Sequence, residues 1–280
     1  MNIGQLVTEQ RNESTKNIDK LDIPEILKLI NEEDKKIAYC VEKAIPDISK
    51  AVELVVEAFN KGGRLIYVGA GTSGRLAIAD ASECHPTFGV PVEMVTAIMA
   101  GGDKAIRVPT EANEDNEEQG RIDIRNLNCC EKDVVMGIAA SGRTPYVIGA
   151  LKEARELGAK TISLANNPNS EIGKIAECKI EVVTGPEVIM GSTRMKAGTS
   201  QKMVLNMITT TAMIKIGKVY SNLMVNIQPT NEKLLDRAIR LVMQATGVAR
   251  EVAEEYFNRA GKSIKEAIMM IGEQEEDKGK

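Results

Sequence analysis

Residues 64–89 read RLIYVGAGTSGRLAIADASECHPTFG, and this stretch decides the fold. An apolar run ends at the glycine-rich turn Gly69–Gly74 and a helical pattern follows, which predicts a strand, a loop and a helix. The glycines let the backbone turn tightly, and a helix that starts there points its N–H groups and its positive dipole end into the loop. A phosphate would fit in such a turn, but glycine-rich turns also serve packing alone, so both interpretations stay open here.

The composition is typical of an ordinary soluble protein. Of the 280 residues, 43% are hydrophobic and 27% are charged, and the formal net charge is -4, which fits neither a disordered chain nor a nucleic-acid-binding one. Aromatic residues make up only 3%, without Trp, so polar hydrogen bonds rather than ring stacking should carry recognition. The length allows one α/β domain with a smaller appendage.

Cysteine and histidine usage argues against a metal site. The five cysteines lack the paired spacing of a zinc site, and His85 is the only histidine, so we expect neither a metal nor a cofactor. A reduced, cytoplasmic chain is the simplest account of the cysteines. No export signal opens the sequence and no apolar stretch approaches the roughly 20 residues of a membrane span, so we expect no membrane partner.

A second turn of the same kind follows later in the chain. Asp133–Ala139 is predicted as a strand and Tyr146–Leu157 as a helix, with the loop Ala140–Pro145 between them. The two turns together favour anion binding, because both place hydroxyl, guanidinium or backbone N–H donors before a helix. The donors of these turns are Thr72, Ser73 and Gly74 in the first, and Ser141, Arg143 and Thr144 in the second.

Further apolar runs predict strands at Pro91–Met99, Lys160–Ala165 and Lys179–Val183, with helices between them. This alternation predicts an α/β fold with a parallel sheet sandwiched by helices, and ligands gathered at the carboxyl ends of the strands. Residues 184–201 add a third cluster of hydroxyls and cations before a long helix. Ser192 and Thr193 in this cluster are equally understandable as helix caps and as ligand contacts.

The two ends of the chain differ from the middle. Residues 1–20 are polar without clear periodicity and resemble a solvated tail. Helical spacing follows, with a kink or break expected at Pro46, and Pro86 is expected to end the helix that begins in the first glycine turn. Helical patterns from Asn231 onward predict a small C-terminal bundle, with a frayed end at Glu273–Lys280.

Single carboxylates are ambiguous from sequence alone. Glu83 lies near a predicted helix end, where a solvated surface carboxylate is the commoner outcome. The acidic run 110–120 is by default a solvated helix face, and its spacing selects no catalytic member. His85 has no second histidine and no Ser/Asp pattern, which favours a bystander over a general base.

Five motifs in order carry a resemblance that covers the chain from Leu6 to about Ile271. They are Thr8–Asn12 with Asn17–Asp19, Gly69–Arg75, Asp80–Cys84, Ala139–Pro145 and Gly191–Thr199. With them the chain resembles the N-acetylmuramic acid 6-phosphate etherases, which are sugar-isomerase-type (SIS) domain proteins. The resemblance implies a flavodoxin-like SIS domain over residues 51–220, after an N-terminal arm and helices at 1–50 and before a helical bundle at 228–275. It also implies a homodimer with active sites near the subunit interface, and an arm that belongs to the folded unit.

The resemblance also implies the site residues. The family's two catalytic carboxylates fall on Glu83, the proton donor to the departing lactate, and on Glu114, a base acting on C2 or on the added water. The three clusters would hold the phosphate and sugar through Thr72, Ser73, Gly74, Ser141, Arg143, Thr144, Ser192 and Thr193. His85 stands where the family usually has proline, so the local shape of the loop at this position could differ from that of the family.

The implied reaction cleaves the lactyl ether of N-acetylmuramic acid 6-phosphate to N-acetylglucosamine 6-phosphate and D-lactate, by elimination followed by addition of water. Two other functions fit a SIS domain. A sugar-phosphate isomerase would use the same loops and a base at C2 without an acid at the ether oxygen, and a sugar-phosphate-sensing regulator would bind without turnover. The two retained glutamates and the absence of an added DNA-binding domain favour the etherase, with a small sugar phosphate as partner and no nucleic acid.

Overall fold

The computed structural model describes residues 3–108, 113–227 and 232–278. Contacts divide the chain into two compact units. Unit 1 comprises Met1–Ala81 and Glu93–Ala212, and unit 2 comprises Ser82–Val92 and Met213–Lys280. Within the described ranges, no helix is both long enough and apolar enough to cross a membrane.

Unit 1 is built on a five-stranded parallel sheet, as the alternation of strands and helices predicts. Its strands are β1 (Leu65–Gly69), β2 (Val95–Met99), β3 (Val134–Ala139), β4 (Lys160–Ala165) and β5 (Cys178–Glu181), in the order β2-β1-β3-β4-β5. The strand order reverses between β1 and β3, and in such sheets ligands bind beyond the carboxyl ends of the two strands at the reversal. Gly69 pairs with Ile138, so the turns that follow these two strands start side by side.

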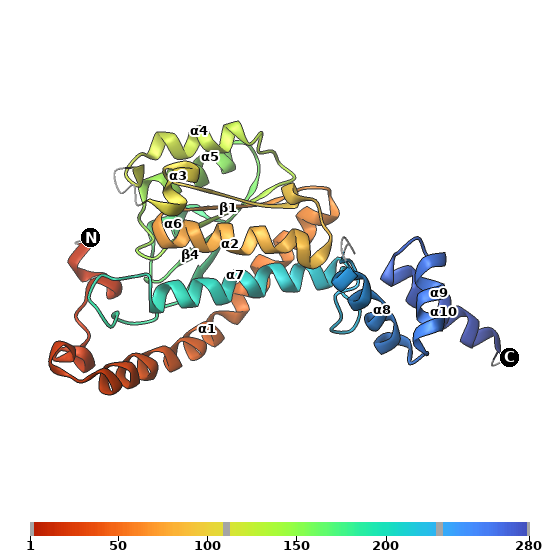
Figure 1. Ribbon diagram of the computed structural model, residues 1–280. Coiled ribbons are helices and arrows are strands. Elements are labelled where there is room, and N and C mark those ends of the chain that lie inside the picture. The colour runs from red at the N-terminus through yellow and green to blue at the C-terminus, as the bar shows by residue number, and fades with distance from the viewer. Residues whose placement is uncertain (1–2, 109–112, 228–231, 279–280) are drawn as a thin grey trace. The chain divides into compact units, whose positions relative to one another are not determined.

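Helices cover both faces of this sheet (Figure 1). Helices α4 (Glu117–Asn126) and α5 (Pro145–Glu156) lie on one face, and α1 (Ile23–Asn60), α2 (Gly71–Phe88) and α7 (Lys196–Lys215) lie on the other. The shorter elements are α3 (Gly102–Arg107), α6 (Glu171–Ile175) and a 3₁₀ turn at Val92–Met94. Every residue of β1 and β3 is buried, which explains their unbroken apolar runs.

Helices α4 and α5 touch backbone to backbone. A Cβ atom on Gly120 would lie 2.0 Å from the carbonyl oxygen of Tyr146, and one on Gly149 would lie 1.9 Å from the carbonyl oxygen of Glu117. Each helix therefore needs a glycine where the other approaches. This contact fixes the starts of α4 and α5, and thus the loops in front of them, relative to each other.

The N-terminal arm is part of unit 1. It forms four short 3₁₀ turns at Ile3–Gln5, Val7–Glu9, Glu13–Thr15 and Ile18–Lys20. The side chain of Asn167 accepts a hydrogen bond from the backbone N–H of Val7 at 2.7 Å and donates one to the Thr8 hydroxyl at 3.0 Å. The Thr15 hydroxyl donates to the carbonyl oxygen of Val188 at 2.8 Å. The solvated-tail interpretation is therefore wrong, because the polar side chains of the arm bind the loops after β4 and β5.

Two prolines do not have the effect that the sequence predicts. Helix α1 continues through Pro46 without a break, and α2 continues through Pro86 to Phe88 instead of ending after Ala81. A proline removes one intrahelical hydrogen bond, and its ring needs space. Pro46 and Pro86 are both exposed, so their rings face solvent and the buried residues around them keep their packing.

Strand boundaries also differ slightly. The second strand begins at Val95 rather than Pro91, because the intervening 3₁₀ turn takes up the preceding residues. The fifth strand is Cys178–Glu181 rather than Lys179–Val183.

Unit 2 contains the predicted helical bundle. Its helices are α8 (Glu232–Thr246), α9 (Arg250–Arg259) and α10 (Ile264–Lys278), which pack around a core that includes Val242, Phe257 and Ile264. The backbone of α10 is helical to Lys278, and the frayed end expected from Glu273 stays a prediction.

Candidate active site

The carboxyl group of Glu114 lies at the first glycine turn. Gly71 has a positive φ of +54°, and a Cβ atom added to it would lie 3.2 Å from Oε1 of Glu114. The backbone carbonyl of Glu114 accepts a hydrogen bond from the N–H of Tyr146, in the first turn of α5, at 3.0 Å. Glu114 therefore connects the turn after β1 with the turn after β3, at the edge where ligands gather in such sheets.

The second turn places the hydroxyls of Ser141 and Thr144 before α5, at the same edge. Thr144 is the N-cap of α5, yet its side chain makes no capping hydrogen bond. The Ser141 hydroxyl accepts a hydrogen bond from the backbone N–H of Arg143 at 3.2 Å, which shapes the loop. Because α2 and α5 both begin at this edge, two helix N-termini direct their positive dipole ends towards an anion there.

Ser73 and Gly74 have structural contacts of their own. Ser73 is buried, and its hydroxyl donates a hydrogen bond to Oε1 of Gln201 in α7 at 2.9 Å. A Cβ atom on Gly74 would lie 2.6 Å from Cβ of Met99, so this glycine permits the close approach of α2 to β2. Packing thus explains why position 74 is a glycine, and the bond to Gln201 explains the Ser73 hydroxyl. The role of both residues as phosphate ligands stays a prediction.

The third hydroxyl cluster lies beside the first turn of α2. A Cβ atom on Gly198 would lie 3.3 Å from Cγ2 of Thr72, and the backbone N–H of Gly198 donates to the carbonyl oxygen of Thr193 at 3.0 Å. The N–H of Ser192 donates to the carbonyl oxygen of Ile189 at 3.0 Å, which closes the turn before α7. The structure therefore brings Thr72 and Thr193 close to the same residue of α7.

A buried ion pair holds this third cluster, and sequence reasoning missed it. Glu187 is fully buried and accepts hydrogen bonds from the backbone N–H groups of Lys196 and Ala197, each at 2.9 Å. Burial raises the pKa of Glu187, and these donors offset only part of that rise. Nζ of Lys196 lies 2.7 Å from Oε2 of Glu33 in α1. Burial opposes ionisation of Glu33, but hydrogen bonds from Lys196 and Lys36 outweigh it and lower its pKa to about 2.

The other carboxylates of the acidic run have different surroundings. Glu117 pairs with Lys152 at 2.7 Å and Glu118 with Arg125 at 3.4 Å, as expected for a solvated helix face. Asp115 is exposed, and Glu111 lies outside the described residues. Only proximity to Gly71 distinguishes Glu114 from these described neighbours, and no spacing rule in the sequence reveals it.

Glu83 lies in unit 2, at the edge of a separate cavity. The cavity has a volume of about 470 Å³ and is lined by Glu83, His85, Pro86, Thr87, Met224, Ile227, Leu234 and Arg237. Glu83 itself is exposed. Nδ1 of His85 lies 2.6 Å from the carbonyl oxygen of Val90, so this ring nitrogen donates the hydrogen bond and fixes the loop after α2.

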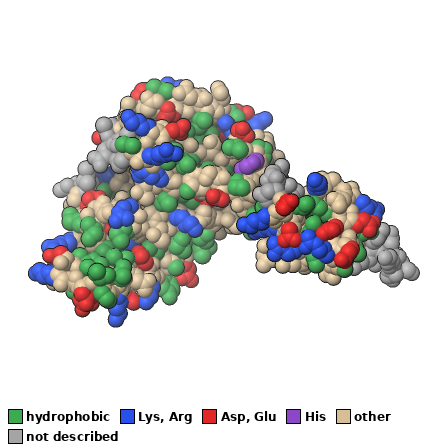
Figure 2. Space-filling model, in the orientation of Figure 1, with side chains coloured by type: hydrophobic (Ala, Val, Ile, Leu, Met, Phe, Trp, Pro, Cys, Tyr) green, Lys and Arg blue, Asp and Glu red, His purple; other side chains and the backbone are tan. Residues whose placement is uncertain are grey.

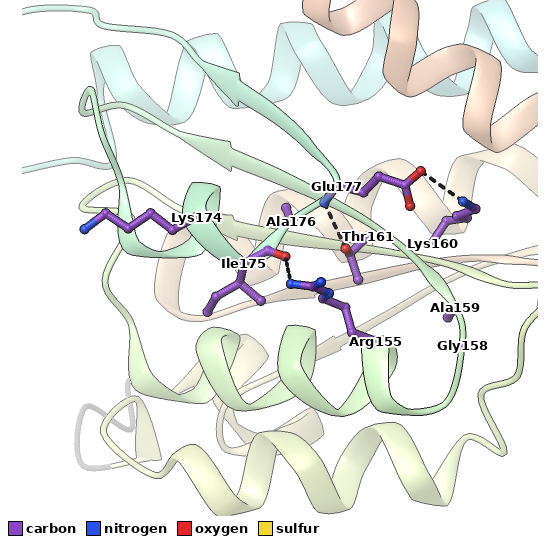
Figure 3. Close-up of a pocket in the computed structure, with 9 residues that line it drawn as sticks. All are labelled: Arg155, Gly158, Ala159, Lys160, Thr161, Lys174, Ile175, Ala176 and Glu177. Atoms are coloured by element: carbon purple, nitrogen blue, oxygen red, sulfur yellow. Dashed lines mark hydrogen bonds and ion pairs between the residues drawn. The ribbon is translucent and has the colours of Figure 1, made fainter.

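Another cavity, of about 510 Å³, lies at the opposite edge of the sheet (Figure 3). Its walls come from the residues before β4 and β5, at the amino ends of the strands. Its polar groups bind one another, because Lys160 pairs with Glu177 at 2.9 Å and Arg155 donates to the carbonyl oxygen of Ile175 at 2.8 Å. We therefore interpret it as a surface hollow rather than a site. Over the described ranges, no group of three or more metal-ligating side chains could hold an ion.

The sequence matches known proteins over almost its whole length. The chain is 56% identical over 269 residues to an N-acetylmuramic acid 6-phosphate etherase of Actinobacillus pleuropneumoniae, covering 96% of this chain and 88% of that protein. The chain belongs to the N-acetylmuramic acid 6-phosphate etherase family. An etherase of Lactococcus lactis subsp. cremoris is 57% identical and covers 95% of this chain and 89% of its own length. An etherase of Caldanaerobacter subterraneus is 56% identical and covers 99% of this chain and 91% of its own length.

The SIS fold of the family is found independently. A profile described as the glucokinase regulatory protein N-terminal SIS domain matches residues 47–155, and one described as the SIS domain matches residues 110–211. A phosphoheptose isomerase from Francisella tularensis superposes with a TM-score of 0.53 at 18% identity, over 69% of this chain and 100% of its own. A phosphoheptose isomerase from Neisseria gonorrhoeae superposes with a TM-score of 0.52 at 19% identity, over 68% of this chain and 98% of its own. These structures share the fold of the etherase chain.

Proposed function

We propose that this protein cleaves the lactyl ether of N-acetylmuramic acid 6-phosphate, giving N-acetylglucosamine 6-phosphate and D-lactate, as a step in the use of cell-wall amino sugars. Relatives that are 56–57% identical over nearly the whole chain are N-acetylmuramic acid 6-phosphate etherases, which supports this substrate. The observation that carries the chemistry is the carboxyl group of Glu114 beside Gly71, at an edge where two helices begin. A carboxylate next to a phosphate-binding turn is in place to remove a proton from a bound sugar phosphate.

Substrate binding follows from the donors at that edge. The phosphate dianion would accept hydrogen bonds from backbone N–H groups at the start of α2 and from the hydroxyls of Thr72, Ser141 and Thr144, beside the positive dipole end of α5. Arg143, Ser192 and Thr193 would supply further donors from the neighbouring loops. Ser73 would contribute through its backbone N–H, because its hydroxyl is bonded to Gln201. The N–H of Gly74 donates to the carbonyl oxygen of Ala70 at 3.2 Å, so Gly74 would contribute by letting the phosphate approach the turn closely.

The reaction needs one base and one acid. In the open-chain sugar the C2 hydrogen is acidified by the C1 aldehyde, so Glu114 removes that proton as the C3–O bond breaks. Glu83 gives a proton to the ether oxygen, which leaves as the hydroxyl of lactate, and a C2–C3 double bond conjugated with the aldehyde remains. Water then adds at C3 and a proton returns to C2. The proton on Glu114 goes back to C2 and the proton lost by water goes to Glu83, so both carboxyl groups end the cycle in the protonation state in which they began and no cofactor is required.

We further propose that the two carboxyl groups of one site come from different subunits of a homodimer. The family resemblance implies active sites near the subunit interface, and Glu83 and Glu114 belong to different compact units of the chain. Glu83 of the partner subunit would therefore act on the sugar that the glycine turns hold.

An exposed apolar surface on α1 supports such a dimer. Ile23 is 75% exposed and Leu27 is 62% exposed, and they follow each other at helical spacing. Figure 2 shows hydrophobic side chains gathered over this end of α1. Apolar groups that face solvent on a stable helix are typical of an interaction surface, and a second copy of the chain is the partner that the family resemblance implies.

A cytoplasmic location also belongs to this proposal. All five cysteines are free thiols, which fits a reducing compartment.

The test is an assay of the purified protein with N-acetylmuramic acid 6-phosphate in ¹⁸O-water. We expect D-lactate to be released and the label to appear at C3 of the sugar. Glu83→Gln and Glu114→Gln should each lower turnover by about 10²–10⁴-fold with an unchanged melting temperature, because each removes one proton transfer. The exposed neighbour Asp115→Asn is the matched control and should keep wild-type turnover. Wild-type rates in either glutamate variant would disprove the role assigned to it.

The same assay addresses the second candidate, a sugar-phosphate sensor, which the glucokinase regulatory protein profile favours. A sensor would bind sugar phosphates and release no lactate. An isomerase would convert aldose to ketose, again without lactate.

A further inference from the structure

We propose that Arg237 binds the carboxylate of the lactyl group, and that the unit 2 cavity it shares with Glu83 is the pocket for the departing lactate. This inference rests on the proposed function, because it assigns the part of the substrate that the glycine turns leave unaccounted for. It names a substrate-binding residue that no motif of the sequence singles out.

The first argument is placement. Glu83 lies near the carboxyl end of α2 and Arg237 lies in the second turn of α8, and both line the same cavity of about 470 Å³. Cavities of a few hundred Å³ with a small number of polar groups are typical small-molecule sites. Both residues belong to unit 2, so this arrangement is a property of one compact unit.

The second argument is charge. The guanidinium group of Arg237 contacts the thioether sulfur of Met224 at 3.8 Å, and no carboxylate in the described part of the chain forms an ion pair with it. Its neighbours on the bundle surface differ, because Arg240 and Arg250 both pair with Asp236, at 2.9 and 2.8 Å. Arg237 therefore offers a full positive charge and a two-pronged set of donors to an anionic ligand at the cavity.

The third argument is the shape of the lactyl group. One carbon atom of this group carries the ether oxygen, a carboxylate and a methyl group. The cavity offers a counterpart for each of the three, because Glu83 can donate to the oxygen, Arg237 can bind the carboxylate, and Ile227 and Leu234 can pack on the methyl. An aldose–ketose isomerase needs none of these three contacts.

The chemistry of the step is balanced with these residues. The C3–O bond breaks, the proton of Glu83 goes to the ether oxygen, and lactate leaves with its carboxylate still bound to Arg237. The guanidinium keeps its proton throughout and acts by holding the leaving group, so that the ether oxygen faces Glu83 during cleavage.

The experiment compares two substrates with wild-type protein and Arg237→Gln. One substrate is N-acetylmuramic acid 6-phosphate and the other is its lactamide analogue, in which a neutral amide replaces the carboxylate. With the acid substrate, Arg237→Gln should lower kcat/KM by about 10- to 100-fold, the range expected for a lost charged hydrogen bond. With the amide, kcat/KM should be similar in both proteins. Arg237→Lys should restore part of the preference for the acid, because it keeps the charge without the bidentate geometry.

Arg240→Gln on the same helix is the matched control, since its side chain is exposed and paired with Asp236 outside the cavity. It should behave as wild type with both substrates. If Arg237→Gln keeps the full preference for the acid, or slows both substrates equally, the inference is wrong and the residue has at most a structural role. If the wild-type protein releases no lactate from the acid substrate, the proposed function itself fails, and this outcome is separate from the other two.

Discussion

At the scale of single residues, Gly71 and Glu114 form the most informative contact in the molecule. The glycine has the positive φ that the turn requires, and the space beside its Cα is bounded by a carboxylate oxygen. A side chain at position 71 would therefore strain the backbone and push the carboxyl group of Glu114 away from the turn. Gly102 offers a comparison, because its φ of +62° is similar and no atom lies within 4 Å of its Cβ position.

We expect Gly71→Ala and Gly102→Ala to destabilise the protein by similar amounts, about 1–2 kcal/mol, because each places an L-residue in the left-handed region. Only Gly71→Ala should also lower kcat for lactate release, because only this variant displaces the carboxyl group of Glu114, the proposed base. Denaturant unfolding measures the first effect and the lactate assay measures the second. Equal activity of the two variants would show that Glu114 does not act from its observed position.

At the scale of elements, the buried pair of Glu33 and Lys196 connects α1 to the start of α7. Its pH dependence has a definite sign. The folded state lowers the pKa of Glu33 from 4.5 to about 2, so the pair stabilises the protein fully above pH 4.5 and loses that contribution as the pH falls towards 2.

We expect Glu33→Gln to destabilise the protein by about 3 kcal/mol at neutral pH, because Lys196 is left buried without its partner. The variant should also lose less stability than wild type between pH 4.5 and pH 2. Urea unfolding at a series of pH values measures both effects. Glu32→Gln removes an exposed i,i+3 pair with Lys35 and is the control. Its curve should lie close to that of wild type, because solvent screens the pair although Lys35 also lowers the pKa of Glu32. Parallel curves for Glu33→Gln and wild type would contradict the lowered pKa.

The sequence predicts the elements of the sheet well, because fully buried parallel strands such as β1 and β3 have to be apolar throughout. The prediction from sequence fails at Pro46 and Pro86. A proline in the sequence shows that one helical hydrogen bond is lost, but it does not show that the ring faces solvent. The donors of the glycine turns are visible as motifs. The bond from Ser73 to Gln201 is not, because it joins residues 128 positions apart and only the fold brings them together.

The carboxylates show the same limit more sharply. Glu114 is one of several acidic residues in its run, and only resemblance to a family selects it from the sequence. Its physical distinction is the contact with Gly71, which depends on how the loop before α4 lies over the turn after β1.

At the scale of the whole molecule, the dimer proposal makes a quantitative prediction for mixed subunits. Neither Glu83→Gln nor Glu114→Gln homodimers should be active. If each site takes Glu83 from one subunit and Glu114 from the other, half of a random mixture is heterodimer with one intact site of two. We therefore expect about a quarter of wild-type activity in a two-fold symmetric dimer. As a control, a mixture of Glu114→Gln with the variant that carries both Glu83→Gln and Glu114→Gln should stay inactive. If the first mixture is inactive as well, the two subunits do not share a site in this way.

The backbone contact between α4 and α5 has a consequence for binding at the site as a whole. Glu114, the proposed base, precedes one helix of this pair, and Thr144, in the proposed phosphate turn, precedes the other, so the contact between the helices holds the two groups together. The conformational entropy of aligning them is lost once, during folding, and not again each time a substrate arrives. The free energy of substrate binding is then available for orienting the sugar itself, which is the condition under which an enzyme gains most from proximity.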